Sequence, residues 1–301
     1  MPGMHRLWAL VAVALLGCGG FIEGQAAKST YRILVHSTEA ARRQPDLELA
    51  RTALPGGILQ LEAFALSYPD HVGFRRLHAE AVCQYPVAFV FDDWEDAVLG
   101  GRIDEAARLA ERMGPLLAAC VDANLALLPA PWRAARAQGG AAMQALLPKA
   151  TRAQVGPLLW IATADGVELG MDPMRHLGKL GGIMAMLARV IELHPGFHDA
   201  DAELLLGTLE AARSKLLGGA DGRARFAAAR AVLGEGGLIA EVMFARAVAT
   251  VGLDAPLFEA TLARVLAADV TRWPERRLSN ELARRKAKRY LAAKAALLPA
   301  R

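Results

Sequence analysis

The sequence is poor in cysteine, in net charge and in long apolar runs. Its 3 cysteines among 301 residues are too few for a disulfide framework. The formal net charge is only +4, and the charged residues are dispersed, so the composition argues against a nucleic-acid partner. Beyond the first residues, no apolar run is long enough to span a bilayer. The sequence therefore excludes a small disulfide-built protein and a membrane span after the N-terminal segment.

The N-terminal segment has the parts of a bacterial lipoprotein signal. A short, weakly positive start precedes an unbroken apolar run over residues 7–16, which is too short to cross a bilayer. The run ends in Leu15-Leu16-Gly17-Cys18, which resembles a lipobox. We therefore predict that residues 1–17 are a signal peptide, that Cys18 is the lipidated first residue of the mature protein, and that residues 18–37 are a tether. The alternatives are an ordinary signal peptide cut nearby and a buried first helix.

The lipid expected on Cys18 also predicts where the protein resides. Gly19 stands in place of the aspartate that usually signals retention at the inner membrane. A periplasm-facing position on the outer membrane is therefore favoured over the inner membrane. One diacylated cysteine holds a membrane weakly, so a further amide-linked acyl chain would make the anchoring stable.

Residues 38–301 are typical of an all-α fold. Alanine, leucine and arginine dominate, and no stretch alternates with the period of two that a half-buried strand needs. Apolar residues instead recur three or four positions apart, as in Leu177, Leu180, Met184, Leu187 and Ile191. Short breakers containing proline or glycine separate the helical stretches. The pattern predicts an array of antiparallel helical hairpins over residues 38–301.

A weak internal repeat accompanies this pattern. Three segments close one helix and open the next with a proline, as tetratricopeptide units do: residues 66–69, 191–195 and 271–274. Their spacing corresponds to units of about 40 residues, longer than the usual ~34, so the repeats are degenerate. Stacked hairpins of this kind form curved surfaces that bind partners.

Several segments resemble, in order, the T-component (TatT) family of tripartite ATP-independent periplasmic (TRAP) transporters. Residues 77–93 resemble a family helix with a tyrosine, an alanine-phenylalanine step and an acidic pair, here Tyr85, Ala88-Phe89 and Asp92-Asp93. The resemblance continues through the Trp160 helix, the turn at residues 190–198, the Phe258 helix and the closing residues 278–287. It spans nearly all of the mature chain.

The resemblance implies an accessory lipoprotein that is not an enzyme. Members of the family are degenerate tetratricopeptide-like hairpin proteins that form homotrimers, with a pore through each subunit. They associate with the periplasmic solute-binding component of the transporter, and their ligand is inferred to be hydrophobic. We therefore expect a solute-binding protein, a membrane reached through the N-terminal lipid and a hydrophobic small molecule as partners, and no nucleic acid.

Aromatic and acidic residues give this expectation a physical form. Four aromatic residues are candidates to line an apolar passage: Tyr85, Phe89, Phe91 and Trp160. Asp92 and Asp93 are candidates for its polar mouth or for a partner contact. The alternative is that Tyr85 and Phe89, four residues apart, are core residues on one helix face and that the two aspartates form a solvated helix surface.

Three further features carry local predictions. Pro86 stands inside a helix, where it removes a backbone donor and should kink the chain. Cys83 and Cys120 both lie in apolar sequence, so two buried thiols are favoured over a disulfide. The basic run at residues 284–289 is interleaved with apolar residues, which favours a solvated face of the final helix.

The sequence offers no catalytic, metal or cofactor site. Asp92 and Asp93 are adjacent on a helix and point to different faces, which does not suit an acid and base pair. One cluster has ligand types that suit zinc: His194, His198, Asp199 and Asp201. A helix break separates its histidines, and an aspartate there more simply caps the next helix. The alternatives to a transporter component are a generic tetratricopeptide-like scaffold lipoprotein of the envelope and a helical periplasmic hydrolase, whose site the sequence does not show.

Overall fold

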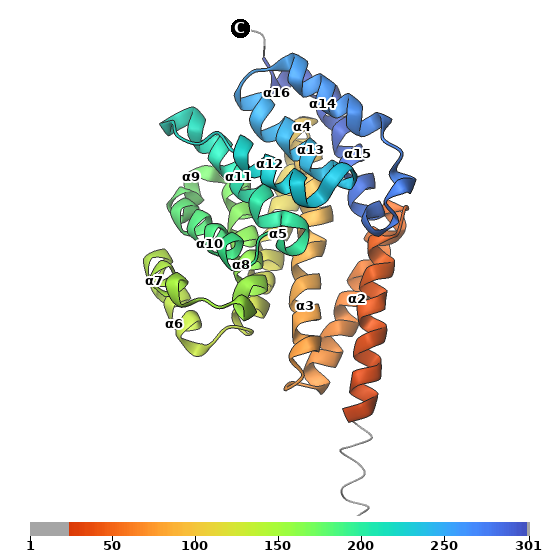
Figure 1. Cartoon of the computed structure of the whole chain (residues 1–301), viewed down its shortest axis with the longest axis vertical. Helices are drawn as coiled ribbons and strands as arrows, with labels where there is room; N and C mark the ends of the chain where they lie inside the picture. The colour runs from red at the N-terminus through yellow and green to blue at the C-terminus, as the bar shows by residue number, and fades with distance from the viewer. Residues whose placement is uncertain (1–23, 300–301) are drawn as a thin grey trace, which may run out of the picture.

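The chain is helical almost throughout, which confirms the all-α prediction. The computed structural model describes residues 24–299, and no strand occurs among them (Figure 1). Within this part of the chain, no helix is both long and apolar enough to cross a membrane. The signal peptide expected at residues 1–17 and the lipidated Cys18 lie outside the described residues.

Three long helices form the N-terminal end of the molecule. The first covers residues 24–42 and packs through Ala27 and Leu34 against the second and third. The expected tether covers residues 18–37, and its described part, residues 24–37, is a packed helix. The helices that follow residues 24–42 are α2 Leu47–Ser67, α3 Val72–Tyr85, α4 Phe91–Leu99 and α5 Ile103–Leu125.

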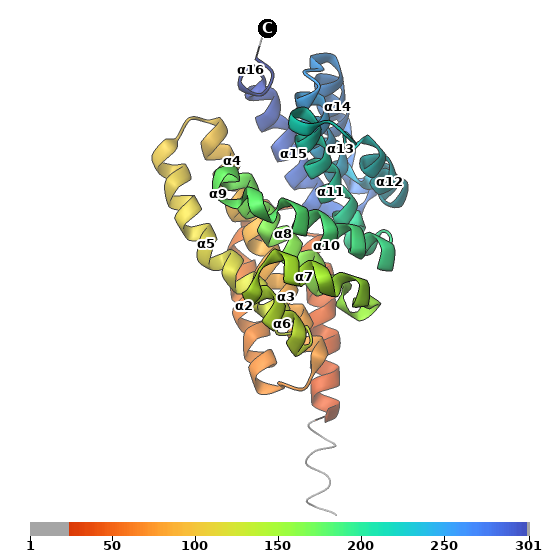
Figure 2. The same ribbon diagram turned by 90° about the vertical axis from the view of Figure 1, so that its left-hand side faces the viewer.

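The middle of the chain is a series of hairpins in which each long helix packs on the next. Helix α8 packs on α5 and on α10, α10 packs on α11, and α11 packs on α12. The shorter α6 and α7 cover one side of this series (Figure 2). The bounds are α6 Ala130–Gln138, α7 Gly140–Leu146, α8 Val155–Met171, α9 Pro173–His176, α10 Leu180–Leu193, α11 Phe197–Leu217 and α12 Arg223–Leu233.

The C-terminal helices bring the array back to its beginning. Helix α15 packs on α13 and α14 and also contacts α2, far away in the sequence. The last helices are therefore held against the first ones, which positions the site described below. The bounds are α13 Leu238–Phe244, α14 Ala255–Ala267, α15 Arg277–Ala292 and α16 Lys294–Leu297.

Two helices end in turns with the same backbone bonding, which is common at helix C-termini. After α4, the Arg102 N–H donates to the Ala97 carbonyl over 2.8 Å, and Gly101 has a φ of +70°. Before α14, the Asp254 N–H donates to the Ala249 carbonyl over 2.9 Å, and Leu253 has a φ of +52°. The three junction prolines lie between long helices, as the sequence predicts: Pro69 between α2 and α3, Pro195 between α10 and α11, and Pro274 between α14 and α15.

Pro86 disturbs its helix without breaking it. Residues Pro86–Val90 form a π-helical segment, η1, which joins α3 directly to α4. The Phe91 N–H donates to the Pro86 carbonyl, five residues back, where an α-helix bonds four back. Because proline has no N–H and its ring crowds the preceding turn, the wider turn accommodates it at this position. A second π-helical segment, η6, covers Ala245–Ala249 after α13.

Candidate functional site

The acidic residues of α4 lie against the basic residues of α15. Asp92 is 0% exposed, and its Oδ1 is 2.7 Å from Lys286 Nζ and 2.7 Å from Arg289 Nη2. Glu95, one turn further along, accepts from the same two cations at 3.0 and 2.5 Å. The Tyr290 hydroxyl also donates to Glu95 over 2.6 Å. Two carboxylates and two cations are thus paired inside the protein.

Asp93 extends this network to a third helix. Its carboxylate accepts from Arg285 of α15 over 3.1 Å and from Arg51 of α2 over 2.9 Å. The guanidinium of Arg51 also lies over the Phe89 ring, 5.2 Å from its centroid. Residues from α2, α4 and α15 therefore form one network, which we call the α4–α15 ion network: Arg51, Asp92, Asp93, Glu95, Arg285, Lys286, Arg289 and Tyr290.

The members of the network stabilise each other's charged forms. Burial raises the pKa of Asp92, but Lys286 and Arg289 outweigh it, so the pKa stays below its usual value. The pKa of Glu95 is lowered in the same way. Burial lowers the pKa of Lys286, but the neighbouring Tyr290, Glu95 and Asp92 raise it overall. The charged forms of Asp92, Glu95 and Lys286 are therefore favoured by their neighbours, and their pairing holds α4 against α15.

Two expectations about these charges are wrong. Asp92 does not belong to a solvated helix surface, because it is fully buried. Lys286 and Arg289 do not belong to a solvated face of the final helix, because they bind the acidic residues of α4. Glu95 and Tyr290 were missed altogether. The sequence did contain one signal: a block of carboxylates at residues 92–96 and a block of cations at residues 284–289, which are opposite in charge.

The predicted aromatic residues lie in one apolar cluster with the cysteines. Tyr85, Phe89 and Trp160 are buried there, and Phe91 packs against the cluster half-buried. The Tyr85 and Phe89 rings lie 5.8 Å apart, which fits the alternative that both are core residues. Two shallow surface recesses of the described chain, at residues 101–108 and 131–146, are lined by other residues. The passage they were expected to line stays a prediction.

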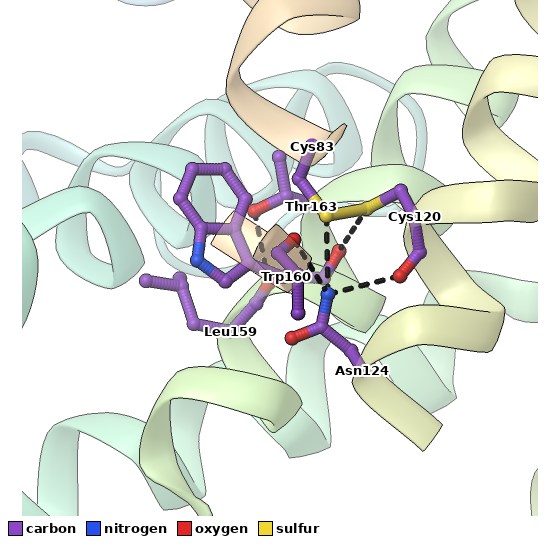
Figure 3. Close-up of a disulfide and its surroundings, with 7 residues drawn as sticks. Cys83, Cys120, Asn124, Leu159, Trp160 and Thr163 are labelled. Carbon is purple, nitrogen blue, oxygen red and sulfur yellow. Dashed lines mark hydrogen bonds between the residues drawn. A yellow bond between two sulfur atoms is a disulfide. The ribbon is translucent and has the colours of Figure 1, made fainter. Parts of the chain in front are cut away.

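A disulfide between Cys83 and Cys120 crosses this cluster, so the expectation of two thiols is wrong. It joins α3 to α5, and both residues are buried (Figure 3). The amide of Asn124 lies beside it and donates to Cys83 Sγ at 3.1 Å and to the Cys120 carbonyl at 2.9 Å. The packing of α3 against α5 brings the two Cα atoms to 4.8 Å, which is within the range that a disulfide spans.

His198 lies at the edge of the same cluster, on an unusual backbone. Residues 198–200 at the start of α11 all have a positive φ, between +51° and +62°, which non-glycine residues rarely adopt. The His198 ring donates to Asp201 over 2.6 Å and to Glu80 of α3 over 3.0 Å. It also packs edge-to-face with the Trp160 ring, with 5.2 Å between the ring centroids. Asp199 is bound by Arg276 over 3.2 Å. These contacts offset the strain of the left-handed turn.

This arrangement corrects the expectation that Asp199 or Asp201 caps a helix. Neither side chain accepts from the first backbone N–H groups of α11, because each is bound to a cation instead. The candidate zinc ligands do not converge either. Among residues 24–299, no three histidine, cysteine or acidic side chains are grouped to hold a metal.

The charge on His198 predicts a pH-dependent stability. Burial lowers the pKa of His198, but its bonds to Asp201 and Glu80 raise it overall to about 10 from 6.5. The stabilisation is complete below pH 6.5 and is lost as the pH rises to about 10. Chemical denaturation over this range should show a falling free energy of unfolding in the wild type and a flatter profile in His198→Gln. The exposed His36→Gln is the control, and an unchanged slope in His198→Gln contradicts the assignment.

The comparison with known proteins agrees with the sequence resemblance. The sequence model of one family, described as TRAP transporter T-component, matches residues 43–298. No curated protein matches the chain. The matched region runs from just before α2 to the end of α16 and includes the α4–α15 ion network, the disulfide and the His198 turn. The chain therefore belongs to the TRAP transporter T-component family.

Proposed function

We propose that this protein is the periplasm-facing accessory lipoprotein of a TRAP transporter and that it binds the solute-binding component. The observation that carries the proposal is the family match over residues 43–298, which implies an accessory role in a TRAP transporter. The array of helical hairpins supports it, because such arrays present extended surfaces to protein partners. By resemblance, the working form is a homotrimer that takes a hydrophobic ligand.

The disulfide supports a location in the periplasm. Buried disulfides form and persist in oxidising compartments, of which the bacterial periplasm is one. The bond between Cys83 and Cys120 therefore fits a chain exported through the signal at residues 1–17. The outer membrane remains favoured over the inner membrane, because Gly19 follows Cys18 where an aspartate would signal retention at the inner membrane.

Of the two aspartates expected to contact a partner, Asp93 is the one that can be tested. Asp92 is fully buried, so its removal disturbs the fold before it affects binding. About a quarter of the Asp93 side chain is exposed, at 23%, beside Arg51 and Arg285. A solute-binding protein can therefore reach Asp93 without a rearrangement of α4.

The direct test is binding to the solute-binding protein encoded with the same transporter. Calorimetry with the mature protein should detect a complex, and light scattering of the free protein should report a trimer. Asp93→Asn should weaken the complex by about threefold to tenfold, as expected for one charge at the rim of an interface. Asp96→Asn is the matched control, since Asp96 is a half-exposed acid on the same helix.

The outcomes separate the transporter component from the scaffold lipoprotein, two of the functions that the sequence leaves open. No complex with the solute-binding protein, together with envelope proteins captured by cross-linking, favours the scaffold lipoprotein instead. Equal affinity of Asp93→Asn and wild type removes Asp93 from the contact surface but leaves the transporter role standing.

The lipid anchor makes a separate prediction. Cys18→Ser should release the protein from membranes into the soluble periplasmic fraction, because no acyl chain can then be attached. Its thermal unfolding should match that of the wild type, since the change removes the lipid and alters none of the core residues. Membrane fractionation and metabolic labelling with a fatty acid measure the effect. A wild type that takes up no fatty-acid label, or a variant that stays on the membrane at high salt, shows that Cys18 is not the anchor.

A further inference from the structure

We propose that the end of the molecule formed by residues 24–32 and 66–76, which we call the tip, rests on the surface of the lipid bilayer. The proposal builds on the lipidation of Cys18 and goes beyond it. A lipid alone leaves the orientation of the protein free, whereas a docked tip holds the long helices upright on the membrane.

The tip lies where the chain leaves toward its anchor. Helix 24–42 begins at the same end of the molecule as the turn between α2 and α3, and both views agree on this (Figures 1 and 2). Contacts bind the two parts together, since the Tyr31 ring lies 5.3 Å from His71 and 5.8 Å from Phe74. Residues 18–23 can reach at most about 20 Å even when fully extended. The tip therefore stays close to the bilayer whenever Cys18 is lipidated.

The tip exposes apolar side chains that a bilayer surface can cover. Leu66, in the last turn of α2, is 75% exposed, and Val72, the first residue of α3, is 47% exposed. Behind them, Tyr31 and Tyr68 are half-buried around Phe74. Tyrosines with one apolar and one polar end favour the boundary between lipid and water. The apolar residues are thus arranged to enter the headgroup region.

The charges at the tip suit an anionic surface. Lys28, Arg32 and Arg76 are exposed, and none of them forms an ion pair with another residue of the chain from 24 to 299. Asp70 is the exposed acid in the turn between α2 and α3. Cations of this kind attract anionic headgroups, and the attraction weakens with salt. Apolar and basic groups therefore point to one partner, an anionic bilayer, rather than to a protein.

The test measures how deeply the tip lies in the membrane. Lipidated protein is reconstituted into vesicles of phosphatidylethanolamine and phosphatidylglycerol, with an environment-sensitive dye attached to Ser67→Cys. The native disulfide keeps Cys83 and Cys120 out of the labelling reaction. Nitroxide-labelled lipid should quench this dye strongly. The matched control is a dye on Ala295→Cys, which is exposed on α16 at the opposite end of the molecule (Figures 1 and 2).

A second measurement tests the tip without the anchor. The soluble Cys18→Ser protein should bind phosphatidylglycerol vesicles weakly, less at high salt and less on phosphatidylcholine. Replacing Leu66 and Val72 by serine should weaken this binding by about tenfold. The control replaces two other exposed apolar residues, Ile103 and Met174, by serine and should leave binding unchanged.

The outcomes distinguish the tip from the lipid. A protein that does not float with vesicles lacks the anchor, and the vesicle binding of the soluble variant then decides whether the tip docks. The proposal is overturned if the floating protein shows equal, weak quenching at Ser67→Cys and Ala295→Cys. It is also overturned if the Leu66 and Val72 replacements leave the binding of the soluble protein unchanged.

Discussion

Asp92→Asn should lower the free energy of unfolding by about 3–5 kcal/mol. The substitution keeps the size of the side chain but removes a charge that is fully buried beside Lys286 and Arg289. Those two cations then share Glu95 as their nearest carboxylate, and burial leaves them poorly solvated. Urea denaturation followed by circular dichroism measures the loss, with the slope expected to stay the same.

The control for this prediction lies on the same helix. Asp96→Asn removes a half-exposed carboxylate that pairs with Arg102 and lies 3.9 Å from Arg289, and it should cost less than about 1 kcal/mol. The double variant Asp92→Asn with Lys286→Met should lose less free energy of unfolding than the sum of the two single variants. The reason is that each substitution removes the charge that the other would leave unpaired. Equal effects of Asp92→Asn and Asp96→Asn would show that the network contributes no more than a surface ion pair.

The same network predicts how the protein responds to acid. The pKa values of Asp92 and Glu95 are lowered in the folded state by Lys286 and Arg289, against the effect of burial. Their stabilisation is therefore present above the unfolded pKa values of about 4 and is lost as the pH falls through the lowered values. In Asp92→Asn the free energy of unfolding should fall less steeply below pH 4 than in the wild type.

Loss of the disulfide should cost about 3–4 kcal/mol, the second large effect. The bond closes a loop between residues 37 apart in sequence, and without it the unfolded chain gains the corresponding freedom. The double variant Cys83→Ser with Cys120→Ser should therefore unfold at a lower urea concentration than the oxidised wild type. The serine hydroxyls enter an apolar cluster, which adds to the loss.

Reductant provides the internal control for the disulfide. Adding it should lower the stability of the wild type toward that of the double variant and should leave the double variant itself unchanged. Because both cysteines are buried, reduction should proceed through unfolding and be slow under native conditions. A wild type whose denaturation curve is insensitive to prolonged reduction in urea would contradict the role given to the bond.

The sequence alone was sufficient for the fold class and for the layout of the hairpins. Apolar residues three or four positions apart define helices because side chains at that spacing share one face, and proline ends helices because it lacks a backbone donor. Both effects are local, so the series ending at Ile191 and the junction at Pro195 could be assigned without a structure, and α10 and its turn follow them. The family resemblance, later confirmed, came from residues in the same local order.

Only the tertiary structure decided which residues of the site meet. Asp92 and Lys286 are far apart in sequence, and the contact depends on α15 returning to α4. Cys83 and Cys120 likewise pair because α3 and α5 pack with a register that brings them together. A charged or apolar side chain does not encode its partner, because many partners satisfy it equally well. The choice is made by the packing of all the helices at once, which no local pattern in the sequence contains.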